Sequence, residues 1–394
     1  MLTAKIRFLK PVFLISFLLA LVICVFLLLT LREAIGSDFV SYLTGAEIIK
    51  ASKGPLLYDL DTQYFYQQSV LFPHHETSIL PFVNFPIIAF ILIPFTYLPL
   101  IWAYKIYIGL LISILLVISN FSKKLFTNLP KNSIFYYLPF LFYPSLGSLF
   151  SGQLTPIILL IFLVIYSQLI KKKYMYAGLM TGLLIVKIQY LVSAPILFVL
   201  AENKKDFLKG FLISCILLFS VNLLLARNFF LPHYLQFIFA VQKPEFGARP
   251  QEMFTFYSSL EQLSAFAQFP KSVLISLNFG FYLLSLVLIA LSAKRISLDI
   301  SYAAVVICSM IFSIHGLNYD YSLVIVPVFI LLNRLYNRST AFDYEKIITL
   351  LLLVLPILFV VNRALYVSFF LLGILIFLIY GKFTNFTRNM AKEA

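Results

Sequence analysis

Long apolar runs separated by short polar stretches constrain this chain more than any other feature of its sequence. A helix that crosses a bilayer needs roughly 20 apolar residues, and a backbone in lipid must satisfy its own hydrogen bonds. The runs lack strand-like alternation, so the sequence predicts an all-α, polytopic membrane helical bundle of roughly 11–13 helical segments. The runs cover about 11–31, 84–98, 100–120, 134–150, 155–170, 174–187, 190–201, 206–226, 273–292, 299–315, 320–333, 346–362 and 364–380.

Composition and charge placement agree with a membrane protein. Only 12% of the 394 residues are charged, whereas a soluble domain carries about 25%. The net charge of +14 is spread over short basic clusters between the apolar runs, for example Lys171–Lys173 and Lys204-Lys205. This is the positive-inside pattern of a polytopic protein. We therefore expect membrane lipids as partners and no nucleic acid.

The chain reads as a single integral membrane domain over residues 1–394. Basic residues precede the run Pro11–Leu31, which we interpret as the first span, with the N-terminus inside. The polar stretch at about 32–83 is then a first outer loop, and the stretch at about 227–272 is a second one. Basic residues in the C-terminal tail place that end inside as well.

The first outer loop contains a predicted helix. Asp38–Ser52 has apolar residues at helical spacing, which predicts an amphipathic helix lying along the membrane surface. Gly54-Pro55 is a stop signal for this helix.

The runs between the two outer loops pose a topological problem. Three runs lie between 84 and 150, which gives an odd number of crossings from one outer position to another. One run must therefore be re-entrant or broken, unless two runs form one long kinked helix. Pro94 and Pro99 are the expected break points.

Four polar positions near the outer ends of the runs are candidates for a functional site, because ionisable groups cost about 2.5–3.5 kcal/mol at mid-bilayer. Asp38 is either a helix N-cap or a general base that takes a proton from an attacking hydroxyl. Lys187 is either an interfacial anchor or a phosphate-binding cation. His315 is either a histidine at the membrane interface or a group that binds a phosphate or sugar. Gln153 is either a turn residue or a second such group.

Further polar residues lie near these positions. Asn318, Tyr319 and Asp320 crowd the turn after His315. The run His74-His75-Glu76 offers too few ligands for a convincing metal site. The sequence thus predicts one outer site, built from residues far apart in the chain.

Five short motifs follow one another along residues 36–335, and their order resembles the GT-C glycosyltransferases of family 87. This family, formerly a domain of unknown function, includes polyprenol-phosphate-mannose-dependent mannosyltransferases. Ile188 and Ile314 stand where the family usually has proline. The motifs are Gly36-Ser37-Asp38-Phe39 through Gly54-Pro55-Leu56-Leu57-Tyr58-Asp59, Phe85-Pro86 with Pro94 and Pro99, Gly152-Gln153-Leu154, Ala177-Gly178-Leu179 with Lys187-Ile188-Gln189, and Ser313-Ile314-His315 with Tyr319-Asp320-Tyr321 and Pro327.

The resemblance implies a hexosyltransferase of the plasma (inner) membrane, with its site facing the periplasm or cell exterior. The donor would be mannose or another hexose on polyprenyl phosphate, and the acceptor a hydroxyl of a glycolipid, glycan or other molecule. Transfer would be inverting, and no cofactor or metal is implied. Asp38 would be the general base. The donor phosphate would be bound by Lys187, His315 and Gln153, and further substrate contacts would come from Gln189, Tyr319, Asp320 and Tyr58.

Two other functions compete with this one. A transporter or lipid flippase would carry its site near the bilayer midplane, often in broken helices. The acidic residues here gather in an outer loop, which favours the enzyme. A non-catalytic assembly partner is the third reading, and it predicts that Asp38 is replaceable without loss of function.

Overall fold

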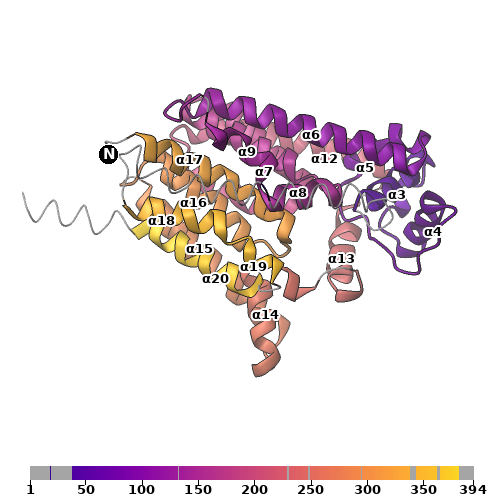
Figure 1. Ribbon diagram of the computed structural model, residues 1–394. Helices are drawn as coiled ribbons and strands as arrows, with labels where there is room; N and C mark the ends of the chain where they lie inside the picture. The colour runs from indigo at the N-terminus through magenta and orange to yellow at the C-terminus, as the bar shows by residue number, and fades with distance from the viewer. Residues whose placement is uncertain are drawn as a thin grey trace, which may run out of the picture.

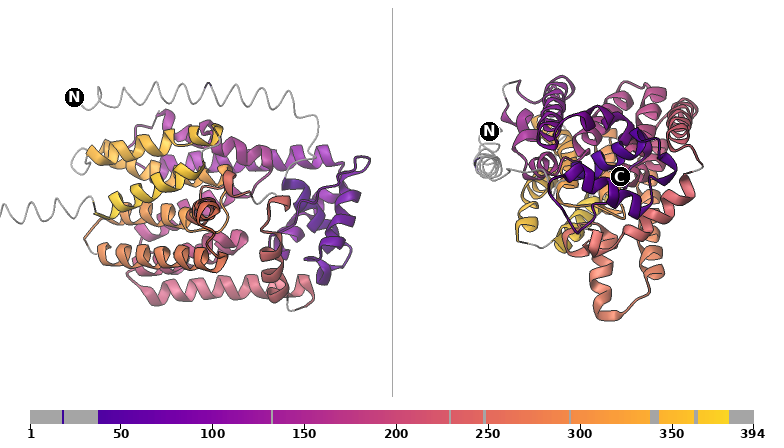
Figure 2. Two further views of the ribbon diagram at one scale, coloured as in Figure 1. Left: turned by 90° about the horizontal axis from the view of Figure 1, so that it is seen from below. Right: turned by 90° about the vertical axis from the view of Figure 1, so that its right-hand side faces the viewer.

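The computed structural model describes residue 18 and residues 38–380, apart from 132, 229, 247–248, 294, 338–342 and 362–363. Over this part of the chain the protein is helical without strands, which confirms the all-α fold. Long helices run side by side, and α3 (Asp38–Lys50) and α4 (Leu60–Leu71) cover one end of the bundle (Figure 1; Figure 2, left). Apart from residue 18, the expected first span lies outside the described residues, as does the basic C-terminal tail.

The described part of the chain contains more and shorter helices than the 11–13 segments expected, because several passes through the bundle are broken. The remaining α-helices are α5 (Pro86–Leu92), α6 (Leu100–Leu125), α7 (Leu138–Leu141), α8 (Tyr143–Ser151), α9 (Thr155–Ile170), α10 (Tyr174–Gly182), α11 (Ala194–Leu200), α12 (Lys204–Ala226), α13 (Leu231–Val241), α14 (Phe256–Ala267), α15 (Lys271–Ser292), α16 (Leu298–Ile311), α17 (Ile325–Tyr336), α18 (Asp343–Val354), α19 (Ile357–Val360) and α20 (Ala364–Tyr380). Short 3-10 helices are η1 (Gly54–Leu56), η2 (Ile93–Tyr97), η3 (Ile134–Tyr137), η4 (Leu183–Ser193), η5 (Pro244–Phe246), η6 (Pro250–Glu252) and η7 (Asn318–Val324).

Five stretches of the described chain are long and apolar enough to cross a membrane, so the protein is a polytopic membrane bundle. The stretches 100–125, 204–226 and 271–292 carry many exposed large apolar side chains, as a lipid-facing surface requires, whereas the stretch 318–336 is almost entirely buried inside the bundle. The five stretches are Leu100–Leu125, Tyr174–Leu200, Lys204–Ala226, Lys271–Ser292 and Asn318–Tyr336.

The basic clusters gather at one end of the bundle, which we call the basic end. Lys172 pairs with Glu202 at 3.2 Å, which joins the turn before α10 to the turn before α12. Tyr166, near the end of α9, donates to Asp299 at 2.9 Å, and Asp299 lies 3.5 Å from Arg334. Successive helices therefore return their basic turns to the same end, as the positive-inside pattern predicts.

The run at 84–98 is the one that does not cross the bundle. The backbone N–H of Ile87 in α5 donates to Asn222 near the far end of α12, at 2.7 Å. The chain then descends along α6 and returns through η3, α7 and α8, since Tyr104 donates to the carbonyl of Phe150 and Ser119 to that of Tyr136. Pro94 lies in η2 and Pro99 caps α6, so the expected break points are confirmed.

The stretch Tyr174–Leu200 is a hairpin and not one straight helix. α10 and α12 run parallel: Gly178 lies against Phe207, and Gly182 lies against Ser214 farther along α12. Phe198 near the end of α11 also contacts Phe207, with ring centroids 6.2 Å apart. The chain thus turns back between α10 and α11, and the turn falls at Lys187, whose backbone is non-helical (φ −131°, ψ 82°).

The prediction that Asp38–Ser52 lies on the membrane surface is wrong. The helix exists as α3, but nearly all of its residues are buried, and it packs against α4, α5 and η2. Two small polar residues in its middle bond to their own helix: Ser41 donates to the carbonyl of Asp38 and Thr44 to that of Val40, each at 2.9 Å. With these hydroxyls satisfied, both faces of the helix can be buried.

The second outer loop is partly helical. α13 lies below α3 and beside α4 in Figure 1, and α14 projects sideways from the bundle (Figure 1; Figure 2, right). The loop returns to the bundle where the N–H of Phe254 donates to the carbonyl of Gly316 at 3.1 Å.

Candidate functional site

The candidate site lies at the end of the bundle opposite the basic end, where α3 meets the turn between α8 and α9. Asp38 is the first residue of α3, and its Oδ2 accepts a hydrogen bond from Nε2 of Gln153 at 2.6 Å. Burial raises the pKa of the Asp38 carboxyl, while the Gln153 bond and the nearby Lys187 ammonium oppose that rise. These opposing effects leave a half-buried carboxylate that is more basic than one in water.

Gly152 explains why Gln153 points at Asp38. It ends α8 in the left-handed region (φ +68°), and the N–H of Gln153 then bonds back to the carbonyl of Ser148 at 2.9 Å. A Cβ on residue 152 would lie 2.8 Å from the Cβ of Phe39. Only glycine allows both this backbone conformation and the close approach of α8 to α3.

Two tyrosines hold the other polar atoms of Gln153. Tyr42, one helical turn after Asp38, donates its hydroxyl to Oε1 of Gln153 at 3.1 Å. Nε2 of Gln153, which donates to Asp38, also donates to the hydroxyl of Tyr319 at 3.1 Å. The amide of Gln153 is therefore fixed at both ends, and Asp38 and Tyr319 share one donor nitrogen.

Lys187 enters the same region from the hairpin turn between α10 and α11. The residue is 8% exposed, and its ammonium pairs with the carboxylate of Asp320, which is fully buried. It also donates to the hydroxyl of Thr155 at 3.2 Å and lies 5.1 Å from the centre of the Tyr319 ring. Lys187, expected as a cation at an outer helix end, is thus buried and paired. Asp320, expected to contact the substrate, is its counter-ion.

Asp320 is itself held from three sides. Its Oδ1 accepts from Lys187 and from Thr155, the latter at 3.1 Å, and its Oδ2 accepts from the N–H of Leu317 at 3.3 Å. A buried carboxylate needs such partners because desolvation is costly. Its neighbour Tyr319 belongs to the Gln153 network, so residues 319 and 320 join the two halves of the site.

His315 lies close to this charge pair but is not a cation. Burial lowers the pKa of its imidazole to about 4, with the Lys187 charge adding to the effect and Asp320 opposing it. Its Nδ1 is 3.1 Å from Nε2 of Gln242, and its backbone carbonyl accepts from Gln189 at 3.2 Å. At neutral pH His315 can contribute a hydrogen bond but no positive charge.

Tyr58 does not join the network. Its hydroxyl donates to the carbonyl of Asn84 at 2.9 Å, and its ring packs among Phe230, Tyr234 and Phe237. It ties the first outer loop to α13, so the contacts of Tyr58 are structural.

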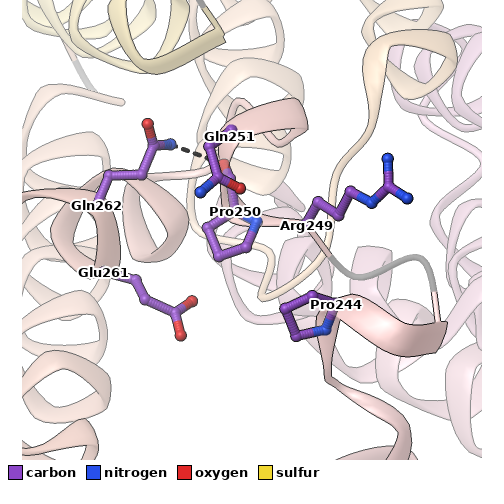
Figure 3. Close-up of a pocket in the computed structure, with 6 residues that line it drawn as sticks. All are labelled: Pro244, Arg249, Pro250, Gln251, Glu261 and Gln262. Atoms are coloured by element: carbon purple, nitrogen blue, oxygen red, sulfur yellow. Dashed lines mark hydrogen bonds between the residues drawn. The ribbon is translucent and has the colours of Figure 1, made fainter. Parts of the chain in front are cut away.

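A cavity of about 320 Å³ adjoins the network at Tyr319. Its wall combines polar and apolar residues from α8, η6, η7, α19 and α20, including Ser151, Glu252, Leu317, Asn318, Tyr319 and Phe359. A second cavity, of about 370 Å³, lies in the second outer loop between η5, η6 and α14 (Figure 3). There Gln262 donates to the carbonyl of Pro250 at 2.7 Å.

Sequence reasoning missed three residues of the site, namely Tyr42, Thr155 and Gln242. Tyr42 follows Asp38 by four residues, so helical spacing places both on one side of α3. Thr155 follows Gln153 by two residues and is the first residue of α9. Gln242 lies in the second outer loop, and nothing in the sequence connects it with His315.

Within the described part of the chain, no group of three or more His, Cys, Asp or Glu side chains is arranged to hold a metal ion. His75 instead bonds to Gln68 at 3.3 Å. In comparisons with protein families, curated proteins and solved structures, no match to this chain was found.

Proposed function

We propose that this protein is a membrane glycosyltransferase that moves a hexose from a polyprenyl-phosphate donor to an acceptor hydroxyl, with inversion and with Asp38 as general base. The observation that carries the proposal is the direct bond between Asp38 and Gln153. It joins the first outer loop to a network that includes the only Lys–Asp pair enclosed at this end of the described bundle.

Asp38 has the properties of a base that works at an attacking hydroxyl. A carboxylate with a raised pKa takes a proton more readily than one in water, and the Gln153 amide keeps the accepting oxygen oriented. Because α3 is buried on both faces, the carboxylate is held at a fixed position relative to Tyr319.

Lys187 is the proposed partner of the donor phosphate. An ammonium has three donor hydrogens, and within the described residues Asp320 and Thr155 accept two of them. The third can reach a phosphate oxygen, where negative charge develops as the lipid phosphate leaves. Gln153 and the neutral His315 would add hydrogen bonds without charge.

The proposed location is the plasma (inner) membrane, with the Asp38 end facing the periplasm or cell exterior. The gathering of basic turns at the opposite end supports this orientation, because the positive-inside rule puts those turns in the cytoplasm.

A direct test is an assay of the purified full chain in lipid nanodiscs with a panel of polyprenyl-phosphate hexoses and glycolipid acceptors. We expect transfer from at least one lipid-linked donor and none from nucleotide sugars. The product anomer should be inverted relative to the donor. Transfer that is undiminished in both Asp38→Ala and Asp38→Asn would remove Asp38 as the base.

A transporter or lipid flippase is the second candidate, and one observation favours it. The hairpin of α10 and α11 breaks at a buried ion pair, as helices do at transporter sites. Flux or lipid scrambling in proteoliposomes, at unchanged rate in Asp38→Asn and without transfer activity, would select this alternative.

A further inference from the structure

We propose that the cavity beside Tyr319 is the binding site for a neutral, hydroxyl-rich acceptor, a glycan, whose attacking hydroxyl it delivers to Asp38. The inference rests on the proposed transferase function and adds to it the class and the place of the acceptor. It is drawn from the lining of the cavity, its anchoring and its connection to Gln153.

The polar part of the lining suits hydroxyl groups. Glu252 offers a carboxylate, Asn318 an amide with both donors and acceptors, and Ser151 a hydroxyl. A sugar presents hydroxyls that both donate and accept, so it can satisfy such a mixed set. Phe359 adds an aromatic ring against which the C–H groups of a sugar can pack.

The charge of the lining argues against the donor phosphate as the occupant. The residues that line the cavity include Glu252 but neither lysine nor arginine. Two cations lie near the lining, and both are paired. Arg249 pairs with Glu252 at 3.1 Å, and Lys187, 5.1 Å from the ring centre of Tyr319, pairs with Asp320. A phosphate in this cavity would face a carboxylate without a cation of its own, whereas a neutral glycan would not.

The cavity walls are tied to the framework of the site. Glu252 lies two residues before Phe254, whose N–H is bonded to the carbonyl of Gly316 next to His315. The ring of Phe359 contacts Phe254 and Tyr321, with centroids 5.8 and 5.5 Å apart. A ligand in the cavity therefore meets walls already held in place, so binding costs little ordering.

Tyr319 connects the cavity to the base. It lines the cavity, and its hydroxyl accepts from the nitrogen of Gln153 that also donates to Asp38. In the proposed reaction, a hydroxyl from the cavity would pass Tyr319 and Gln153 to reach Asp38. The proton then moves from the acceptor oxygen to Asp38 while that oxygen bonds to the sugar carbon and the lipid phosphate leaves.

The first experiment measures binding without turnover. Saturation-transfer NMR on the full chain in nanodiscs would use methyl α- and β-hexopyranosides as probes, with inorganic phosphate as a competitor. We expect a signal from at least one hexoside that 10 mM phosphate does not remove. The signal should fall at least five-fold in Glu252→Gln and in Asn318→Ala.

The matched control is Glu261→Gln, which changes the same chemical group in the lining of the other cavity (Figure 3). It should leave the hexoside signal within two-fold of wild type. An equal loss in Glu261→Gln, a signal untouched in both cavity variants, or no hexoside signal from wild type would each overturn the assignment of the cavity.

The second experiment distinguishes the assignment of the cavity to the acceptor from the proposed transferase activity. In the transfer assay, Glu252→Gln and Asn318→Ala should raise the KM for acceptor at least ten-fold and leave the KM for donor within two-fold. A rise in donor KM alone overturns the acceptor assignment while leaving the transferase intact. Hexoside binding that depends on Glu252, without transfer from any donor, would instead support the cavity and overturn the proposed function.

Discussion

The molecule buries an ion pair at each end, and the two pairs are built differently. At the basic end, Arg334 contacts Glu345 at 3.0 Å and Asp299 at 3.5 Å between α16, α17 and α18. At the other end, Lys187 and Asp320 meet at an irregular backbone, where a hairpin turn faces the 3-10 segment η7.

The surroundings of the two pairs differ as well. The Arg334 cluster joins the ends of regular helices, and Ser297 adds a further acceptor at 3.1 Å. The Lys187 pair touches Tyr319, which borders a cavity and bonds to Gln153. Burial of charge alone therefore does not mark a functional site. Broken helices, an adjoining cavity and a connection to a half-buried carboxylate distinguish one pair from the other.

The largest effect should come from Asp38→Asn, because it removes the proposed base and keeps the shape of the side chain. Loss of general-base catalysis typically lowers kcat by about 10²–10⁴-fold. The thermal unfolding midpoint should not fall. Initial rates with saturating donor and acceptor measure the effect.

Asp59→Asn is the matched control for that variant. Asp59 lies in the same outer loop and caps α4 by accepting from the N–H of Thr62 at 2.8 Å, a role that asparagine also performs. Equal losses in the two variants would mean that the outer loop, and not the Asp38 carboxylate, is what transfer requires.

Single and double changes at the two ion pairs test the comparison directly. Arg334→Met and Lys187→Met each strand a buried carboxylate and should each cost about 3–5 kcal/mol of stability. Adding Glu345→Gln to the first and Asp320→Asn to the second should restore much of that loss. Thermal midpoints in detergent, read beside transfer rates, provide both measurements.

The two double variants should differ in activity. The Arg334→Met/Glu345→Gln protein should regain transfer together with stability, since its pair only holds helices together. The Lys187→Met/Asp320→Asn protein should regain stability while its transfer stays at least ten-fold below wild type. If transfer recovers in both double variants, the Lys187–Asp320 pair has only a structural role.

A smaller loss is expected from Gly152→Ala. The change places a Cβ in a left-handed conformation and against Phe39, which together should cost about 2–3 kcal/mol and move Gln153. Gly280→Ala in α15 is the control, because no atom lies within 4 Å of the added methyl group. A thermal midpoint that drops only in the first variant would confirm that the turn positions the site.

The smallest effect concerns pH and His315. Because its folded pKa of about 4 lies below the ordinary 6.5, the folded state binds fewer protons between these values than the unfolded state. The stability associated with the neutral ring is present above pH 6.5 and is lost as pH falls towards 4. His315→Gln should make the thermal unfolding midpoint depend less on pH over this window. If the midpoint varies with pH as steeply as in wild type, His315 is not a neutral imidazole held in the folded protein.

The sequence predicted the helical bundle, and it predicted that the candidate residues Asp38, Gln153 and Lys187 lie at one end of it. The lengths of the apolar runs and the positions of the basic clusters between them can be read directly from the sequence. The sequence also selected Asp38, Gln153 and Lys187, because polar groups beside apolar runs stand out.

The sequence could not predict which residues pair in space. Lys187 and Asp320 are 133 positions apart, so their mutual neutralisation depends on how the hairpin turn meets η7. The burial of α3 was also hidden, since Ser41 and Thr44 look solvent-facing until their bonds to their own helix are known. The roles assigned to these residues in sugar transfer stay predictions.

The burial of α3 has a consequence for the choice of acceptor. A carboxylate at the start of a helix packed on both faces cannot swing outward to meet an incoming molecule. If Asp38 is the base of a glycosyltransferase, the acceptor would have to bring its hydroxyl the whole distance to Asp38 on a narrow group. The length and width of the group that carries the hydroxyl, more than the affinity of the acceptor, would then decide which molecules receive a sugar.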